Sequence, residues 1–353
     1  MTDAPSGLNV GPTRHMLSAL WQTAWFLSGP TASGKSTVGI ELAGRLDAEI
    51  ISMDSMALYC SMDIGTAKPT CQERRQVAHH LIDVLEPWEE YSLAQYLSAA
   101  GRCAEDISAR GRKALFVGGT PLYLKGLLRG VFEGPPADWE FRRRLADEAR
   151  RQGDVWLHER LAAVDAASAQ RLHPNDTRRL IRALEVYEKT GRPISQWQRQ
   201  FQTGQRAERC QVFVLDWPRP ALYARIDRRV EAMFADGLVE EVRNLLAQSR
   251  PLSRTARQAV GYREVIEHLD GIRPLADTIA LVQQHTRQLA KRQLTWFHSL
   301  GECRFVPLSD PFDARAVADQ ILAFVEPLSR EAEGGRSESE KGITDFGAGE
   351  GCK

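Results

Sequence analysis

Short apolar runs alternate with stretches of helical periodicity in the first third of the chain. The runs at 24–28, 49–52 and 114–117 have the length and composition of buried strands. Between them, apolar residues recur at helical spacing in 37–46 and 92–109. This alternation predicts a parallel sheet covered by helices on both faces.

The pattern changes in the middle of the chain. From residue 136 to 205 the strand-like runs stop, and the segment is helical and rich in arginine. A strand-like run at 211–216 resumes the sheet, and 220–300 is again mostly helical, with breaks at glycine and proline. We therefore predict an α/β core made of residues 21–135 and 206–327, interrupted by an inserted helical subdomain at 136–205.

The two ends of the chain differ from the rest. Residues 328–353 are polar, charged and rich in Gly and Ser, so they cannot bury enough apolar surface to offset their ordering entropy. We expect a disordered tail at 328–353 and a flexible N-terminal extension at 1–20.

The composition is that of a globular chain of 353 residues, about two domains long. Lys and Arg, 46 together, balance 46 Asp and Glu, which excludes a uniformly basic nucleic-acid coat; binding of nucleic acid requires a local basic patch. The six cysteines form no C-x-x-C pair and no metal-like cluster, so we expect a reduced, cytoplasmic protein. No apolar run approaches the roughly 20 residues of a membrane span, and we expect no span and no signal peptide.

A glycine-rich motif stands directly between the first predicted strand and the first predicted helix. Residues 29–36 read GPTASGKS and match the phosphate-binding pattern G-x-x-x-x-G-K-[ST]. In this pattern backbone amides and a helix N-terminus converge on phosphate oxygens, the lysine adds positive charge, and the hydroxyl binds Mg²⁺. We predict a P-loop NTPase-like core in which Ser36 binds Mg²⁺ and the phosphate site is formed by Gly29, Pro30, Thr31, Ala32, Ser33, Gly34, Lys35 and Ser36.

A phosphate loop does not by itself specify a reaction. Its common uses are nucleotide hydrolysis and phosphoryl transfer to a small molecule, which require a metal-binding Asp at a second strand end. Asp216 ends the run 211–216 and is a candidate, although an Asp before Trp217 and Pro218 also fits a plain turn. The motif alone leaves a nucleotide-dependent small-molecule kinase open.

The stretch after the second predicted strand narrows the choice of reaction. Residues 50–59 read IISMDSMALY and residues 62–69 read MDIGTAKP. With the phosphate loop, they resemble the tRNA dimethylallyltransferases, also called tRNA isopentenyltransferases, in their bacterial form. The likeness covers about residues 24–310 and continues, in order, through HHLIDV at 79–84, VGGTPLY at 117–123, LHPND at 172–176, AVGYR at 259–263 and RQLAKRQ at 287–293.

The resemblance implies transfer of a dimethylallyl group from dimethylallyl diphosphate to N6 of the adenosine 3′ to the anticodon, with release of diphosphate. The phosphate loop would then hold the prenyl donor with Mg²⁺. The tRNA anticodon stem-loop would be the partner, and no protein partner is implied. By the same resemblance, Thr31 and Ser33 lie beside the diphosphate.

The resemblance makes Asp54 and Thr120 the catalytic residues. An Asp with a usual pKa near 3.9 is too weak to deprotonate an adenine amine in advance. Asp54 is therefore expected to orient the amine and to take its proton as the C–N bond forms. Without the resemblance, Asp54 fits a helix cap or a turn equally well, and Thr120 fits a helix cap.

A neutral chain that binds tRNA needs a local basic surface. Residues 171–199 carry seven basic residues against three acidic ones, and Arg178 and Arg182 lie one helical turn apart. Such a charge run is also typical of a solvated helix face. By resemblance, Arg263 reaches a phosphate of the donor or of the RNA. The predicted tRNA contacts are Asp54, Ser55, Met56, Ala57, Thr120, Arg142, Arg178, Arg179, Leu180, Ile181, Arg182, Gln258, Ala259, Val260, Gly261, Tyr262 and Arg263.

Two further alternatives stay open besides the kinase. One is a prenyltransferase acting on free adenine nucleotides, against which the long basic insertion argues, because a mononucleotide needs no such surface. The other is an RNA-binding module with a vestigial phosphate loop. The pair His79 and His80 has no third ligand at metal-like spacing, so we expect both to be structural.

Overall fold

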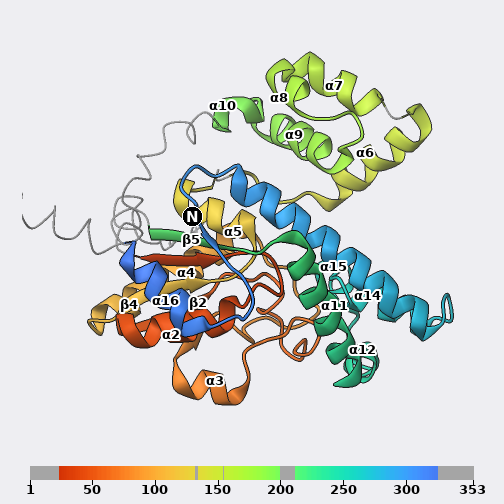
Figure 1. Cartoon of the computed structure of the whole chain (residues 1–353). Helices are drawn as coiled ribbons and strands as arrows, with labels where there is room; N and C mark the ends of the chain where they lie inside the picture. Colours follow the sequence, from red (N-terminus) through yellow and green to blue (C-terminus); the bar gives the residue numbers. More distant parts are fainter. Residues whose placement is uncertain (1–23, 132–133, 154, 199–210, 325–353) are drawn as a thin grey trace, which may run out of the picture. The chain divides into compact units, whose positions relative to one another are not determined.

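The computed structural model describes residues 24–131, 134–153, 155–198 and 211–324 (Figure 1). The predicted flexible extension at 1–20 and the predicted disordered tail at 328–353 lie outside these residues. The chain forms two compact units, one made of Met1–Leu124 and Glu208–Lys353 and the other of Lys125–Ala207. Each unit has a hydrophobic core of its own.

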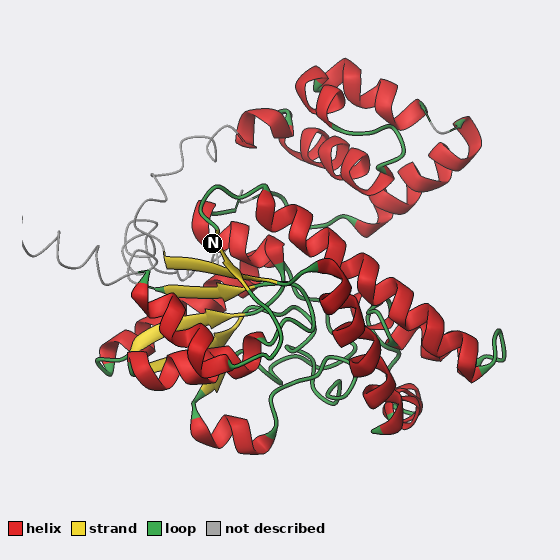
Figure 2. Ribbon diagram, in the orientation of Figure 1, coloured by secondary structure: helices red, strands yellow, loops and turns green. Residues whose placement is uncertain are grey.

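The first unit is built on a six-stranded sheet with the strand order β3-β2-β4-β1-β5-β6, and every pair is parallel (Figure 2). The four predicted strands are confirmed to within one residue at each end. Two edge strands were not predicted, because one has two residues and the other follows no clear apolar pattern. The strands are β1 (Trp25–Ser28), β2 (Ala48–Ser52), β3 (His79–His80), β4 (Lys113–Val117), β5 (Gln211–Asp216) and β6 (Arg304–Pro307).

The central strand β1 is buried along its whole length, and its side chains alternate between the two faces. Trp25 and Leu27 belong to the core cluster that also contains residues of α2 (Lys35–Leu46) and α16 (Ala314–Ala323). On the other face, Phe26 stacks on Phe116 of β4 with ring centroids 5.0 Å apart. The predicted helix α4 (Leu93–Ala109) packs against β2 and β4.

The remaining helices of the first unit begin and end near the predicted breaks. Gly237 and Gly261, with φ of 102° and 95°, precede α12 and α14 in a conformation that favours glycine. No helix in the described residues has the length and apolar character needed to cross a membrane. The helices are α3 (Cys71–Gln76), α5 (Pro121–Arg129), which runs into the second unit, α11 (Arg219–Ala235), α12 (Leu238–Leu246), α13 (Arg254–Arg257), α14 (Tyr262–Leu269) and α15 (Leu275–His298).

The second unit is helical throughout its described residues. The side chains of Asp138, Asp165 and Asp176 accept backbone amides at the starts of three of its helices, as helix caps do. Its helices are α6 (Trp139–Gln152), α7 (Trp156–Val164), α8 (Ala166–Arg171), α9 (Thr177–Thr190) and α10 (Ile194–Gln198).

The core of the second unit contains two of the residues predicted to contact tRNA. Leu180 and Ile181 of α9 are buried among the apolar residues of α6 and α7. Their side chains therefore hold the helix in place and do not face solvent, as is typical of the apolar face of an amphipathic helix. A contact of these two residues with tRNA would use their backbone, and it stays a prediction.

A buried carboxylate links α9 to α6. Glu185 is fully buried and accepts two hydrogen bonds of 2.8 Å from Arg142, one from Arg182, and one of 2.7 Å from the Asp138 amide. Desolvation opposes ionisation, but these hydrogen bonds outweigh it and lower the pKa of Glu185. Two of the predicted tRNA-binding arginines, Arg142 and Arg182, are thus bound to an internal acid.

Glu185→Gln is expected to destabilise the helical unit. Removing the charge leaves two partly buried arginines without their counter-ion, at a cost of about 2 kcal/mol in the free energy of unfolding. Because the fold lowers the pKa, the unfolded state binds the proton more tightly, and the contribution is lost as pH falls below about 4.3. Urea unfolding at pH 7 and pH 4 measures both effects.

The matched control is Glu188→Gln, an exposed position one turn further along α9. An equal loss of stability in both variants would show that the buried network contributes nothing specific.

Candidate functional site

The phosphate loop joins β1 to α2 at the carboxyl edge of the sheet. A Cβ on Gly29 would lie 2.9 Å from Ser33 Oγ, and Gly34 has φ of 89°, so both glycines are needed for the tight turn. No side chain caps the start of α2, and its first amides have no acceptor within the helix. The loop thus presents a set of free amides and a helix N-terminus, the arrangement that binds phosphate oxygens.

Two side chains that follow β5 in the chain hold the carbonyl groups of the loop. Trp217, just after β5, donates its indole N–H to the Ser33 carbonyl at 3.0 Å. Arg225 of α11 donates Nε to the Ala32 carbonyl at 3.1 Å, and its guanidinium lies over the Trp217 ring, 4.4 Å from the centroid. Because Trp217 and Arg225 bind these two carbonyl groups, they keep the loop in one conformation.

Gln293 of α15 connects the phosphate loop to the turn after β4. Its Oε1 accepts the Thr31 amide at 2.9 Å, and its Nε2 donates to the Gly119 carbonyl at 2.6 Å. One amide side chain therefore fixes the spacing between two turns that are far apart in the sequence.

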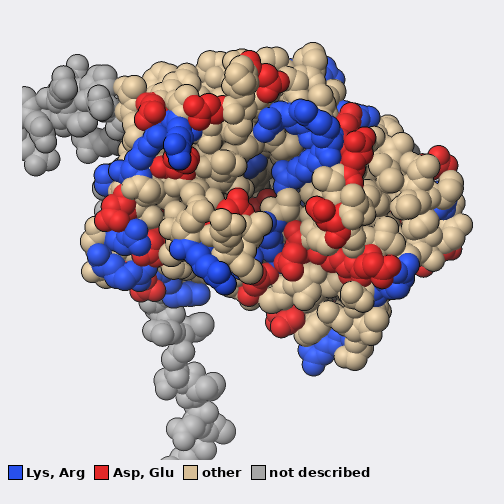
Figure 3. All heavy atoms as spheres, turned by 60° about the horizontal axis from the view of Figure 1, so that its bottom comes forward, with Lys and Arg blue, Asp and Glu red and all other residues tan. Residues whose placement is uncertain are grey.

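A cavity of about 600 Å³ opens in front of the loop. Residues 31–37 form one wall, and Asp54, Gly118 and Gly119 lie at the ends of the neighbouring strands. Residues 66–69 and three arginines of α11 also line it, together with Ile50, Ser52, Ala57, His79, Ile82, Val117 and Gln293. On the face drawn in Figure 3, Lys and Arg side chains gather around a hollow in the surface.

Basic residues outnumber acidic residues in the lining of the cavity. Asp54 is the one acidic residue, whereas the basic residues are Lys35, Lys68, Arg225, Arg228 and Arg229. Lys68 has acidic partners of its own in Asp63 and Asp83. Burial lowers the pKa of Arg229, against the opposing charge of Asp54, and no hydrogen bond or ion pair of Arg229 occurs among the described residues. The cavity is therefore suited to a ligand that carries several negative charges.

Lys35 is the most strongly perturbed of these bases. Its Nζ donates to the Pro30 carbonyl at 2.7 Å. Desolvation and the positive charge of Arg229 lower the pKa of Lys35 to about 7, while Asp54 acts in the opposite direction. A bound anion would favour the protonated form, so ligand binding and protonation of Lys35 are coupled.

Asp54 lies in a tight turn at the end of β2. Its Oδ1 accepts the Met56 amide at 2.9 Å. The Ser55 amide donates to Thr120 Oγ1 at 3.0 Å, so Thr120 supports the turn from the end of β4 and does not itself line the cavity. The structure thus brings Asp54 to the cavity with the phosphate loop and places Thr120 behind it.

The lining also offers hydroxyl groups for an anion and a cation. Ser33 Oγ is buried and has no hydrogen-bond partner among the described residues, while Ser36 is exposed to the cavity from the first turn of α2. A Mg²⁺ ion bound to a diphosphate takes few protein ligands, so the Ser36 hydroxyl fits the predicted role. Asp216, the alternative metal ligand, does not line the cavity, and no cluster of three His, Cys, Asp or Glu occurs in the described residues.

The predicted tRNA contacts at 258–263 differ in their exposure to solvent. Gln258 and Arg263 are exposed, whereas Ala259, Gly261 and Tyr262 are buried. Arg263 is bonded to Glu264 and to His285 Nδ1 and does not line the cavity. The Tyr262 side chain is fully covered, so a contact of this residue with tRNA would use its backbone.

The arginines of the helical unit divide into two kinds. Arg142 and Arg182 bind the buried Glu185, as described above. Arg178 is exposed and has no partner among the described residues, and Arg179 has an ion pair of 3.3 Å with Asp176 while its side chain stays 64% exposed. Arg178 and Arg179 are therefore the arginines of α9 best placed to meet a phosphate backbone.

The IPP transferase family model matches residues 57–300 of the chain. The chain belongs to the IPP transferase family. It is 48% identical over 313 residues to a tRNA dimethylallyltransferase of Rhodopirellula baltica, covering 86% of this chain and 93% of that protein. A tRNA dimethylallyltransferase of Geobacter metallireducens is 45% identical over 298 residues, covering 84% and 96%.

Solved structures of IPP transferases share the fold. The tRNA isopentenylpyrophosphate transferase of Bacillus halodurans has a TM-score of 0.65 and 33% identity, covering 88% of this chain and 98% of that chain. A eukaryotic dimethylallyltransferase crystallised while acting on tRNA has a TM-score of 0.71 and 27% identity, covering 87% and 79%. The resemblance seen in the sequence motifs is therefore confirmed, and so is the P-loop NTPase-like sheet.

Sequence reasoning missed Arg225, Arg228 and Arg229, which line the cavity. Their spacing on one helix indicated a shared face, but nothing in the pattern showed that this face lies at the phosphate loop. Gln293 and Lys68 stand in motifs that carried the resemblance, yet the motifs did not show their contacts: Gln293 binds Gly119, 174 residues away, and Lys68 binds Asp83, 15 residues away.

The pKa of Lys35 predicts how diphosphate binding depends on pH. Because only the protonated lysine attracts the anion, wild-type affinity for inorganic diphosphate, relative to Lys35→Arg, should fall about tenfold between pH 6 and pH 8. Arginine stays charged across this pH range, so the comparison with Lys35→Arg removes the effect of the ligand's own titration. Calorimetric titrations of both proteins give the comparison, and parallel pH profiles would contradict the shift.

Proposed function

We propose that this protein transfers a dimethylallyl group from dimethylallyl diphosphate to N6 of the adenosine 3′ to the anticodon in tRNA. The observation that carries the proposal is a positively charged cavity in front of a phosphate loop, with the single carboxylate of Asp54 in its lining. Membership of the IPP transferase family and relatives named tRNA dimethylallyltransferase support the reaction.

In this proposal the leaving diphosphate binds at the phosphate loop. Cleavage of the C–O bond increases the negative charge on the diphosphate, and Lys35, Arg229 and the amides at the start of α2 stabilise that charge. Loss of one such donor commonly costs about a hundred- to a thousandfold in rate. Ser36 would hold Mg²⁺, which when bound neutralises part of the diphosphate charge.

Asp54 serves the acceptor in this proposal. The adenine amine shares its lone pair with the ring, so it is a weak nucleophile that loses its proton only as the C–N bond forms. The Asp54 carboxylate accepts a hydrogen bond from the N–H group of the amine and then takes the proton. Thr120 acts through the backbone, because its hydroxyl holds the Ser55 amide beside Asp54.

The anticodon loop of tRNA supplies the acceptor base. An adenosine in a loop can turn out of its stack into a pocket, and its neighbours are then held through their phosphates. We assign the phosphate contacts to exposed basic residues of the helical unit, Arg178 and Arg179 first. No such surface is needed for a free adenine nucleotide, and this favours tRNA as the substrate.

Asp54→Asn is expected to lower turnover by about a hundredfold or more, because the amide cannot take the proton. The variant should still bind tRNA as the wild type does, so the loss is one of turnover. The measurement is prenylated adenosine in tRNA digests, quantified by mass spectrometry after incubation with dimethylallyl diphosphate. Asp277→Asn, an exposed change in the first turn of α15, is the matched control.

The same assay separates the alternatives. Phosphate transfer from γ-labelled ATP without prenyl transfer would identify a kinase. Turnover of AMP with none of tRNA would identify a prenyltransferase of free nucleotides, and tRNA binding without any transfer would identify a binding module.

Replacing Arg178 and Arg179 by alanine should weaken tRNA binding and reduce the slope of log Kd against log salt by about two. Each arginine that leaves a phosphate returns about one counter-ion to the RNA. Filter binding at a series of salt concentrations measures the slope, with Arg243→Ala on α12 as the comparison because Arg243 is paired with Glu240. An unchanged slope would remove this end of α9 from the interface.

A further inference from the structure

Residues 62–69 belong to no helix or strand, and the last four of them form part of the wall of the catalytic cavity. Thr66, Ala67, Lys68 and Pro69 line the cavity. Within the segment, Thr66 Oγ1 donates to the Met62 carbonyl at 2.6 Å and the Lys68 amide donates to the Asp63 carbonyl at 3.1 Å. These local bonds define a turn, but they do not fix where the turn stands relative to the phosphate loop.

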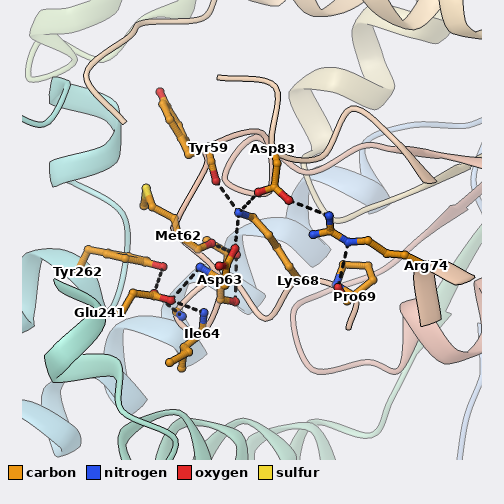
Figure 4. A network of polar contacts seen from close by, with 12 residues as sticks. Tyr59, Met62, Asp63, Ile64, Lys68, Pro69, Arg74, Asp83, Glu241 and Tyr262 are labelled. Atoms are coloured by element: carbon orange, nitrogen blue, oxygen red, sulfur yellow. Dashed lines mark hydrogen bonds and ion pairs between the residues drawn. The ribbon is translucent and has the colours of Figure 1, made fainter. Parts of the chain in front are cut away.

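One carboxylate from α12 accepts three successive amides of this segment. Glu241 Oε2 accepts the amides of Asp63 and Ile64 at 2.9 and 2.7 Å, and Oε1 accepts that of Gly65 at 3.2 Å (Figure 4). Adjacent amides that point the same way form an anion-binding concavity. Here the anion is a side chain of the same protein, which ties the segment to a helix from the second half of the sequence.

Tyr262 fixes this carboxylate through a hydrogen bond. Its hydroxyl donates to Glu241 Oε1 at 2.6 Å, and its side chain is fully buried at the start of α14. Burial and the charge of Glu241 raise the pKa of Tyr262, so the hydroxyl remains a donor at neutral pH. A Cβ on Gly65 would lie 2.5 Å from the Tyr262 ring, and the backbone of the segment therefore rests directly on the ring.

The opposite side of the segment is held independently. Lys68 Nζ donates to the Tyr59 carbonyl at 2.5 Å and to carboxylate oxygens of Asp63 and Asp83 at 2.7 and 2.5 Å (Figure 4). Desolvation is outweighed by the hydrogen bonds from Lys68 and Arg74, which lower the pKa of Asp83. Lys68 therefore anchors the segment near β3, while Glu241 anchors it to α12.

We propose that Glu241 and Tyr262 are positioning residues for the transfer reaction: together they set the place of the cavity wall 62–69 relative to the phosphate loop and Asp54. Neither residue lines the cavity, so both act through the segment. The role rests on the proposed function, because a displaced wall would disturb the alignment of the prenyl donor with the acceptor base. Misplacement of a reacting group by about 1 Å can cost about a hundredfold in rate.

The test is Glu241→Gln, which keeps the shape of the side chain but puts an N–H group against the backbone amides. Hydrogen exchange at the amides of residues 63–65 should quicken about tenfold or more, since an exposed amide exchanges once its acceptor is lost. The kcat for prenyl transfer, counted per molecule competent to bind tRNA, should fall about tenfold to a hundredfold. Simple loss of folded protein would reduce the number of competent molecules and leave kcat for the remainder unchanged.

The matched control is Glu240→Gln, the preceding residue of α12, whose carboxylate faces Arg243 and touches no part of the segment. It should leave exchange and kcat unchanged. If Glu241→Gln does not accumulate as folded protein, Tyr262→Phe carries the same test, because it removes the hydroxyl donor and keeps the ring under Gly65.

Faster exchange with lower kcat in these variants, and neither change in Glu240→Gln, supports the proposal. Unchanged exchange would overturn the anchoring of the segment, and faster exchange with normal kcat and KM would overturn the positioning role. If the wild type transfers no prenyl group to tRNA, the proposed function fails and the positioning role fails with it. The exchange measurement then still reports on the anchor alone, which keeps the two failures apart.

Discussion

The site depends on the close packing of three backbone turns at the ends of neighbouring strands. The Met53 carbonyl after β2 lies so near Gly118 that a Cβ there would be 2.1 Å from its oxygen. On the other side, the Gly118 amide donates to the Leu27 carbonyl at 3.1 Å, and Ser28 Oγ donates to the Gly118 carbonyl at 2.7 Å. Because no side chain intervenes, the turn that bears Asp54 and the phosphate loop that follows Ser28 are held at a fixed spacing.

Positive charge is concentrated where this packing leaves a cavity. Lys35 and Arg229 lie in a partly desolvated region where the charged forms are disfavoured, and Asp54 compensates them only in part. This arrangement costs stability in the free protein and strengthens the attraction for a diphosphate. Carbonyl groups of the loop are bound from behind by Trp217 and Arg225, so the loop requires little rearrangement when an anion binds.

The sequence predicted the parts of the fold that depend on local pattern. The strands β1, β2, β4 and β5 were found from short apolar runs, and the phosphate loop from its glycine spacing, because both signals lie within a few consecutive residues. The strands β3 and β6 were missed, since β3 has only two residues and β6 follows no clear apolar pattern. Leu180 and Ile181, which were listed among the predicted tRNA contacts, have their side chains in the core of the helical unit, as their apolar character indicates.

In the candidate site, too, some residues could be predicted from the sequence and others could not. The positions of Asp54 and Lys35 could be predicted, because each follows a recognisable strand or motif. The contribution of Arg229 and Gln293 could not, since each acts on residues far away in the sequence.

The sequence by itself determined that this chain has a phosphate loop on a parallel sheet, and that its motifs are those of the IPP transferase family. Only the tertiary structure decided which charged side chains are free to meet a ligand. Arg182 is held by a buried acid while Arg178, one turn away, is exposed, and Glu241 is bound to three backbone amides while Glu240, its neighbour, is not. The reason is that a charge is neutralised by what lies near it in space, whereas a sequence records only what lies near it along the chain.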